Sequence, residues 1–234
     1  GIHDLQVSLF ERLLNCCKKN GWNHAFGMLT HQARMHDSIG DIASDLFYGS
    51  KLRTMSERQT QPLAGSIVPQ EHLYHGISVH AVQTILRHRC VFIPSQPAHT
   101  HKVNAGEAHT AAAIAELLFA HYESEGLPWN RMTLGIITPF RAQIQQIQRE
   151  LPPRLLDSVV VDTVERFQGS ERDIIIISTV VSSSSRQPSI QSLLMVNNEL
   201  IDRKLNVALT RARERCIILG DAQILSSMPQ YREL

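Results

Sequence analysis

The residues best suited to chemistry lie in an arginine-rich segment near the end of the chain, residues 203–215 (R-K-L-N-V-A-L-T-R-A-R-E-R). It holds five basic residues and one acidic residue, a local excess of four positive charges. Guanidinium groups suit phosphate oxygens because they donate two parallel hydrogen bonds. The segment could therefore bind a phosphate, although its charge alone is more typical of a solvated helix face.

A second polar segment, residues 161–173 (V-D-T-V-E-R-F-Q-G-S-E-R-D), comes directly before an apolar run. The pattern predicts a strand, a polar loop that contains Gly169, and a second strand. On these residues alone, a plain connector and a ligand-binding loop are equally good interpretations.

Several familiar catalytic patterns are missing from the sequence. It contains no G-x-x-x-x-G-K-[ST] phosphate loop, no G-x-G-x-x-G and no G-x-S-x-G. His99 and His101 form a close pair, but no cysteine or acidic residue stands beside them at metal-ligand spacing. We therefore expect no metal site and no complete triphosphate site within this chain.

The elements that must position these segments alternate between helices and short apolar strands. Apolar spacing and capping residues predict helices over residues 3–20, 36–48, 106–125, 141–151 and 198–213, with a short one after Ser78. Strands are expected over residues 90–94, 134–138, 159–162, 174–181 and 216–220. Residues 53–76 are predicted to be a loop or an insertion, and residues 182–196 a mobile polar loop.

Strands that are apolar on both faces and alternate with helices indicate an α/β fold with a mostly parallel sheet, covered by helices on both faces. Ligands of such sheets gather beyond the carboxyl ends of the strands. This rule points to Thr138 and Pro139, to residues 163–169, and to the loops that lead into Arg211.

The composition limits the function classes. The chain has 234 residues, of which 43% are hydrophobic, with 23 Lys and Arg against 22 Asp and Glu. These figures exclude a strongly basic protein and the disordered, collagen-like and disulfide-scaffold classes. No apolar run is long enough to cross a bilayer and no secretory signal is present, so we expect a cytoplasmic protein, or a nuclear one in a eukaryote, without a membrane partner.

Five stretches together resemble superfamily 1 helicases, in the branch that holds the nonsense-mediated-decay helicase and the Okazaki-fragment nuclease–helicase. Residues 161–178 and 205–215 are similar to the family's motifs V and VI, and residues 135–143 (G-I-I-T-P-F-R-A-Q) to its motif IV. Residues 32–52, which open with Q-A-R-M-H-D, and residues 104–108 resemble two further family stretches. The five stretches follow the family's order.

The resemblance implies the second of two RecA-like motor domains in an ATP-dependent helicase, lacking its own phosphate loop. Residues 1–25 would then be a linker helix from the preceding motor domain, and residues 26–234 the second domain. The first domain would lie upstream of Gly1, which reads like the middle of a polypeptide, and would supply the ligands of the Mg²⁺ that accompanies ATP. This fragment alone is expected to be inactive.

The resemblance also assigns residues to roles. Arg34 and Arg211 resemble the two arginines that reach the γ-phosphate of ATP. The nucleotide-binding positions that match the family are Gln32, Gln168, Gly169, Glu171 and Arg213. Contacts to single-stranded nucleic acid, DNA more than RNA, are expected from Thr138, Pro139 and Thr163.

One departure from the family keeps a second interpretation open. Ala33 stands where the family usually has a tyrosine that stacks on adenine, and an alanine cannot stack. The alternative is a degenerate RecA-like module that binds nucleic acid or a protein partner without turnover. A phosphate loop upstream of Gly1 would favour the motor, and its loss would favour the module.

Overall fold

The computed structural model describes residues 9–63, 76–97, 102–183, 185, 187–196 and 199–234. Its contacts divide the chain into two compact units, residues 1–31 and residues 32–234. The first unit holds helix α1 (Leu9–Lys19) and a 3₁₀ turn, η2 (Asn23–Ala25). The expected helix over residues 3–20 is found from Leu9 onward, and residues 1–8 lie outside the described part. None of the residues of α1 is buried.

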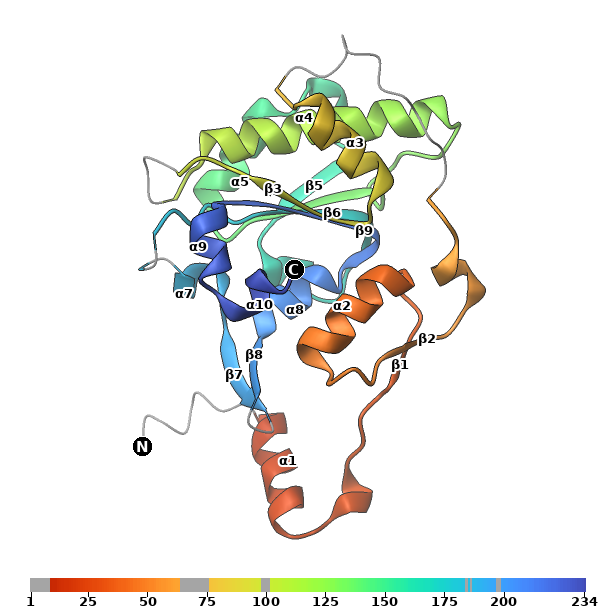
Figure 1. The fold of residues 1–234 in the computed structure, drawn as a ribbon, viewed down its shortest axis with the longest axis vertical. Helices are drawn as coiled ribbons and strands as arrows, with labels where there is room; N and C mark the ends of the chain where they lie inside the picture. The colour runs from red at the N-terminus through yellow and green to blue at the C-terminus, as the bar shows by residue number, and fades with distance from the viewer. Residues whose placement is uncertain (1–8, 64–75, 98–101, 184, 186, 197–198) are drawn as a thin grey trace. The chain divides into compact units, whose positions relative to one another are not determined.

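The second unit is built on a five-stranded sheet in the order β3-β9-β6-β4-β5, and all four neighbouring pairs are parallel (Figure 1). The bounds are β3 (Cys90–Pro94), β4 (Leu134–Ile137), β5 (Val159–Asp162), β6 (Arg172–Ser178) and β9 (Ala212–Gly220). The parallel sheet predicted from the apolar strands is therefore confirmed. The last strand begins earlier than expected, and β6 covers residues 172–178 rather than 174–181.

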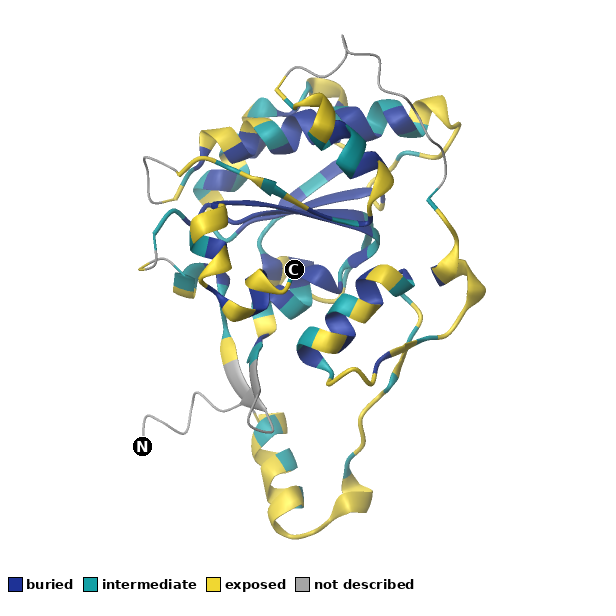
Figure 2. Cartoon of the chain, viewed as in Figure 1, coloured by how far each residue is buried: buried dark blue, intermediate teal, exposed yellow. Residues whose placement is uncertain are grey.

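Helices cover both faces of this sheet (Figure 1). One face packs against α3 (Val79–Arg87), α4 (Ala105–Ser124) and α5 (Arg141–Glu150). The opposite face packs against α2 (Asp37–Phe47), α6 (Val164–Phe167), α8 (Arg203–Leu209), α9 (Ala222–Ser226) and the segment of α10 (Pro229–Arg232). The strands in the middle are almost wholly buried, as Figure 2 shows.

The central strand β6 shows how the sequence produces this sandwich. Ile174 and Ile176 belong to the core under α3, α4 and α5, whereas Ile175 and Ile177 belong to the core on the other face. Side chains alternate between the faces of a strand, so a strand buried on both faces must be apolar at every position. Each fully buried isoleucine contributes roughly 1.5–3 kcal/mol by leaving water.

Side-chain caps fix where several helices begin. The Oγ of Ser78 accepts a hydrogen bond from the Ala81 N–H at the start of α3, as the sequence predicts. Asn104 caps α4 by accepting from the Glu107 N–H. Asp202 caps α8 by accepting from the N–H groups of Lys204 and Leu205.

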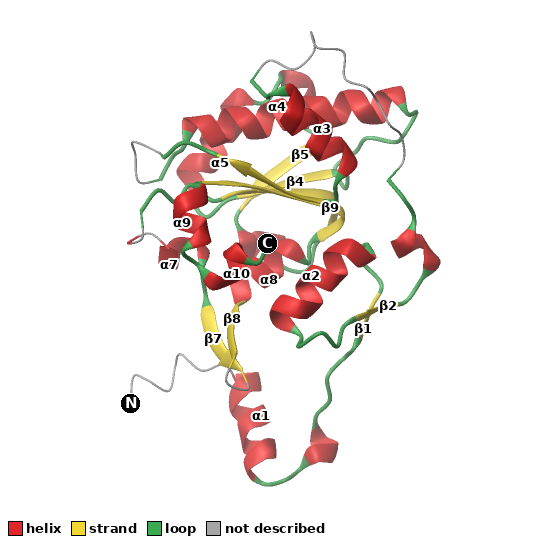
Figure 3. Ribbon diagram, viewed as in Figure 1, coloured by secondary structure: helices red, strands yellow, loops and turns green. Residues whose placement is uncertain are grey.

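The segment before the arginine-rich stretch differs from the prediction (Figure 3). Instead of a loop over residues 182–196 and a helix over 198–213, the chain forms α7 (Gln187–Ile190) and an antiparallel pair, β7 (Leu193–Val196) with β8 (Glu199–Asp202). Helix α8 begins only at Arg203, because Asp202 caps it there, and it ends at Leu209. Ala212 and Arg213 already belong to β9, so this stretch is not the end of a long helix.

Several other short elements also escaped the sequence prediction. Within residues 53–76, β2 (Arg53–Thr54) forms a two-stranded sheet with β1 (His31–Gln32), and a 3₁₀ turn, η3 (Glu57–Thr60), follows; residues 64–75 lie outside the described part. Another 3₁₀ turn, η4 (Pro153–Leu155), follows α5. The expected loop between β5 and β6 contains the single helical turn α6.

Gly135 in β4 offers a test of how tightly this sandwich packs. A Cβ added there would lie 2.7 Å from Cε1 of Phe167 and 3.0 Å from Cγ of Arg172. We expect Gly135→Ala to lower the free energy of unfolding by about 1–3 kcal/mol, because the Phe167 ring is fully enclosed and must shift.

Denaturant titration of the variant and the wild type measures this difference. Gly27→Ala is the matched control, since nothing lies within 4 Å of a Cβ at that position. Equal midpoints for Gly135→Ala and the wild type would contradict the packing argument.

Candidate functional site

Within the second unit, residues 32–234, the predicted site residues lie at two opposite edges of the sheet. Glu171 directly precedes β6 and Arg211 directly precedes β9, which places both at the amino ends of parallel strands. Thr138 directly follows β4 and Thr163 directly follows β5, which places them at the carboxyl ends. The expectation that the loop into Arg211 lies at the carboxyl edge is therefore wrong.

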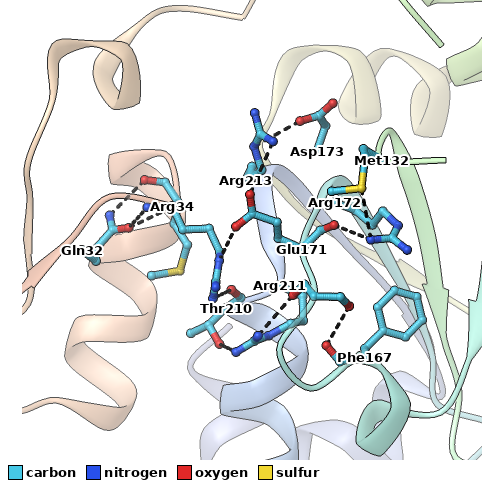
Figure 4. A network of polar contacts seen from close by, with 12 residues as sticks. Gln32, Arg34, Met132, Phe167, Glu171, Arg172, Asp173, Thr210, Arg211 and Arg213 are labelled. Carbon is cyan, nitrogen blue, oxygen red and sulfur yellow. Dashed lines mark hydrogen bonds and ion pairs between the residues drawn. The ribbon is translucent and has the colours of Figure 1, made fainter. Parts of the chain in front are cut away.

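The amino-edge cluster, defined here as Arg34, Glu171, Thr210, Arg211 and Arg213, joins three distant parts of the chain (Figure 4). Nε of Arg34 lies 2.7 Å from Oε2 of Glu171, and Nη1 of Arg34 donates to the carbonyl oxygen of Thr210 at 3.1 Å. The other Glu171 oxygen, Oε1, lies 3.5 Å from Nη1 of Arg213. Glu171 is thus shared between two arginines.

The guanidinium of Arg211 is held by three acceptors from nearby loops. Its Nε donates to the Val207 carbonyl at 3.1 Å, its Nη1 to the Ser170 carbonyl at 3.2 Å, and its Nη2 to Oγ1 of Thr210 at 3.4 Å. Burial, and then the positive charge of Arg34, lower the pKa of Arg211 below its usual value. Two guanidiniums that repel each other in this way favour an anion that contacts both.

Arg213 has a different setting from Arg211. Its Nε lies 3.3 Å from Oδ1 of Asp173, in addition to the Glu171 contact (Figure 4). Its backbone carbonyl accepts from the N–H of His36 at 2.7 Å. Arg213 is therefore tied to two carboxylates and to the segment that follows Arg34.

Gln32 shapes the loop that carries Arg34. Its Oε1 accepts from the N–H groups of Arg34, at 2.9 Å, and of Met35, at 2.8 Å. Its Nε2 donates to the Met35 carbonyl at 2.9 Å. The Gln32 amide, to which the family resemblance gives a nucleotide contact, is thus engaged within its own loop, while the neighbouring Ala33 is exposed.

Gln168 and Gly169 form the exposed turn between α6 and β6. Gly169 has a φ of +83°, a conformation that side chains with a Cβ disfavour. The turn is closed by the Ser170 N–H, which donates to the Phe167 carbonyl at 3.0 Å. It thereby delivers the Ser170 carbonyl to Arg211 and the Glu171 side chain to Arg34.

At the carboxyl edge, the three residues predicted to contact single-stranded nucleic acid differ in their exposure to solvent. Thr138 is fully buried, its N–H donates to the Asp162 carbonyl, and its hydroxyl has no hydrogen-bond partner among the described residues. Pro139 and Thr163 are half-buried. The side chain of Thr138 is therefore inaccessible to a nucleic-acid strand in this conformation. The sequence did not indicate this burial.

A buried carboxyl group at the same edge was not assigned a role from the sequence. Glu107 is fully buried and accepts hydrogen bonds from Oγ of Ser178 at 2.7 Å, the Val180 N–H at 3.0 Å and Oγ of Ser95 at 3.0 Å. Burial raises its pKa to about 7. The spacing of Asn104 and Glu107 at a helix start was the available signal.

No group of three or more His, Cys, Asp or Glu side chains that could hold a metal ion occurs in the part of the chain that the structure describes. His99 and His101 lie outside that part. Among the described helices, none is long and apolar enough to cross a membrane.

The five-stranded parallel sheet with helices on both faces is the arrangement of a RecA-like α/β domain. The AAA_12 family, described as "AAA domain", matches residues 5–223. The chain therefore belongs to this family, which is the C-terminal region of superfamily 1 helicases.

Several relatives match almost the whole chain. It is 29% identical over 95% of its length to the DNA replication ATP-dependent helicase/nuclease dna2 of Schizosaccharomyces pombe. It is 30% identical over 98% of its length to the Regulator of nonsense transcripts 1 homolog of Arabidopsis thaliana, and 28% identical over 98% to the Putative helicase MOV-10 of Gallus gallus. The chain spans only 15%, 17% and 25% of these proteins.

A solved structure of the C-terminal domain of a possible DNA helicase from Lactobacillus plantarum is also similar. The match has 13% sequence identity and a TM-score of 0.39, and it covers 81% of this chain and 88% of that one.

The ion pair between Arg34 and Glu171 predicts a pH effect. The hydrogen bond from Arg34 holds the pKa of Glu171 below its ordinary value of 4.5. The pair therefore contributes stability above pH 4.5 and loses it as the pH falls through the lowered value. We expect Arg34→Ala to raise the pKa of Glu171 toward 4.5.

NMR titration of the side-chain carboxyl carbon measures this pKa directly. The exposed Arg149 on α5 gives the control variant Arg149→Ala, which should leave Glu171 unchanged. An unaltered Glu171 pKa in Arg34→Ala would contradict the pairing.

Proposed function

We propose that this chain is the second motor domain of an ATP-dependent nucleic-acid helicase or translocase, and that it completes an ATP site shared with an upstream RecA-like domain in cis. The observation that carries the proposal is the amino-edge cluster, in which Arg34 and Arg213 share the carboxylate of Glu171 and the positive charge of Arg34 acts on Arg211. Family membership supports the same assignment.

Arg34 and Arg211 act as the two arginine fingers toward the γ-phosphate. Arg211 is fixed by backbone carbonyls, so it can present its remaining N–H groups without reorganisation. Arg34 is held by Glu171 at 2.7 Å and must loosen this contact to reach a phosphate. Glu171 then stays paired with Arg213, which keeps the displaced carboxylate neutralised.

The residues present fit a triphosphate but supply only half of its site. Guanidiniums match phosphate oxygens, whereas Glu171 and Asp173 are already paired with arginines and are poor candidates for Mg²⁺ ligands. We assign the Mg²⁺ ligands and the phosphate loop to the upstream domain. When bound, ATP and Mg²⁺ supply the phosphoryl group whose hydrolysis powers the motor; the arginines neutralise its charge.

Single-stranded nucleic acid is proposed to bind at the carboxyl edge, near Pro139 and Thr163. Backbone amides and hydroxyls in such loops follow phosphates without reading bases. Thr138 supports the loop from within, because it is buried. We favour DNA over RNA, since residues 164–173 resemble DNA-acting members of the family.

Residues 1–25 are proposed to be the linker from the preceding motor domain, and residues 26–234 the second domain. The first unit exposes Leu9, Phe10 and Leu13 on α1, with exposed fractions of 71%, 74% and 56%. Exposed apolar side chains grouped in this way favour a protein partner, here the upstream domain.

The alternative, a RecA-like module that binds without turnover, is favoured by Ala33. Its methyl group cannot stack on an adenine. The other residues of the Gln32–Met35 loop, which the structure describes in full, include no aromatic side chain. The two functions predict different behaviour of the longer protein that carries this domain.

ATP hydrolysis by that protein, stimulated by single-stranded DNA or RNA in parallel, separates them. We expect Arg211→Ala to lower the stimulated turnover by about 10³-fold while ATP binding is largely retained, because the finger acts on the transition state. Arg149→Ala, which removes an equal charge from the far face of the sheet, should be neutral.

Stimulated turnover that survives Arg211→Ala would contradict the finger assignment. No stimulated turnover in the wild type would overturn the motor and leave the binding module. The stronger of the two nucleic-acid responses tests the preference for DNA.

A further inference from the structure

Gln59 lies in the segment that the sequence marked as a loop or insertion, yet it contacts the loop that carries Arg34. The side chain belongs to η3 and is only 4% exposed. Its Nε2 donates to the Met35 carbonyl at 2.7 Å and to the Gln32 carbonyl at 3.2 Å. These two carbonyls bracket Arg34 in the sequence.

The other end of the same amide fastens Gln59 to its own segment. Its Oε1 accepts from the N–H groups of Met55 and Ser56 and from Oγ of Ser56, each at 3.1 Å. A buried amide with five hydrogen bonds is a rigid bridge. Every donor and acceptor is satisfied, and breaking any one of these bonds would leave a buried polar group unpaired at a cost in free energy.

We propose that Gln59 is a positioning residue for Arg34, and that the 53–63 segment exists in part to hold this finger in place. The proposal rests on the proposed function, in which Arg34 reaches a phosphate. Arg34 must exchange its contact with Glu171 without losing its own backbone position. The Gln59 bridge meets that need because it grips the backbone on both sides of Arg34 and leaves the side chain untouched.

In the described part of the chain, Gln59 is the side chain from the 53–63 segment that donates to both the Gln32 and Met35 carbonyls; His36 makes a separate contact with the Gln61 carbonyl at 2.9 Å. Gln61 is the nearest chemical equivalent, but its Nε2 donates only to the Glu57 carbonyl, within its own turn. Gln32 also donates to the Met35 carbonyl, so the loop keeps one tie when Gln59 is changed. Loss of Gln59 is therefore expected to displace the loop rather than unfold it.

Gln59→Met tests the proposal in the full-length protein that carries this domain, with Gln61→Met as the matched control. Methionine keeps the volume and removes the amide. We expect kcat for stimulated ATP hydrolysis to fall about 10- to 100-fold with little change in KM, because a small misplacement of a transition-state group costs this much. Gln61→Met should match the wild type.

A double-mutant cycle with Arg34→Ala separates positioning from a general loss of structure. If Gln59 acts through Arg34, Gln59→Met causes no further loss once Arg34 is alanine. An equal fold loss in both backgrounds would overturn the proposal. Gln59→Glu, measured at pH 8, is the second variant: it keeps acceptors for Met55 and Ser56, loses both donors to the loop, and should show the same coupling.

Hydrogen exchange in the 234-residue chain gives a readout that does not depend on hydrolysis. We expect faster exchange at the amides of Arg34 and Met35 in Gln59→Met than in Gln61→Met. Equal exchange in the two variants would overturn the positioning role, even if the wild type proves to have no turnover. A wild type without turnover but with faster exchange in Gln59→Met would reject the proposed function alone.

Discussion

The parallel pairing of β6 with both β4 and β9 is the constraint on which the rest of the domain depends. A central strand in such a sheet must be apolar on both faces, so it needs helices above and below. The polar residues required for chemistry are then confined to the ends of the strands. This confinement explains why Glu171 and Arg211, which start neighbouring strands, meet at one edge.

Local patterns were enough to predict much of this fold. The run of four isoleucines in β6, the Ser78 cap and the strands at residues 90–94 and 159–162 follow from periodicity and capping preferences. The region from residue 182 to 213 was not predictable in this way. Asp202 ends one strand and caps the next helix, and its effect overrides the helical spacing that continues through it.

The sequence offered candidate site residues, but it could not give their geometry. The family resemblance named Arg34, Glu171 and Arg211, but the contact between Arg34 and Glu171 joins positions 137 residues apart. Burial of Thr138 and the bridge made by Gln59 are tertiary facts of the same kind. The Ser56-x-x-Gln59 spacing of a capping box signals a helical turn, but it does not signal the contact with the Met35 carbonyl.

The segment from Thr163 to Glu171 runs from the carboxyl edge of the sheet back to the amino edge, with Phe167 packed over Gly135 of β4. Seven strand residues separate the two edges by roughly 20 Å. The strands between them are close-packed and resist compression, so the two edges keep a constant separation. We therefore expect the sheet and its helices to move as a rigid body. A displacement at the amino edge of the sheet would then displace the carboxyl edge by the same amount, without rearranging the core.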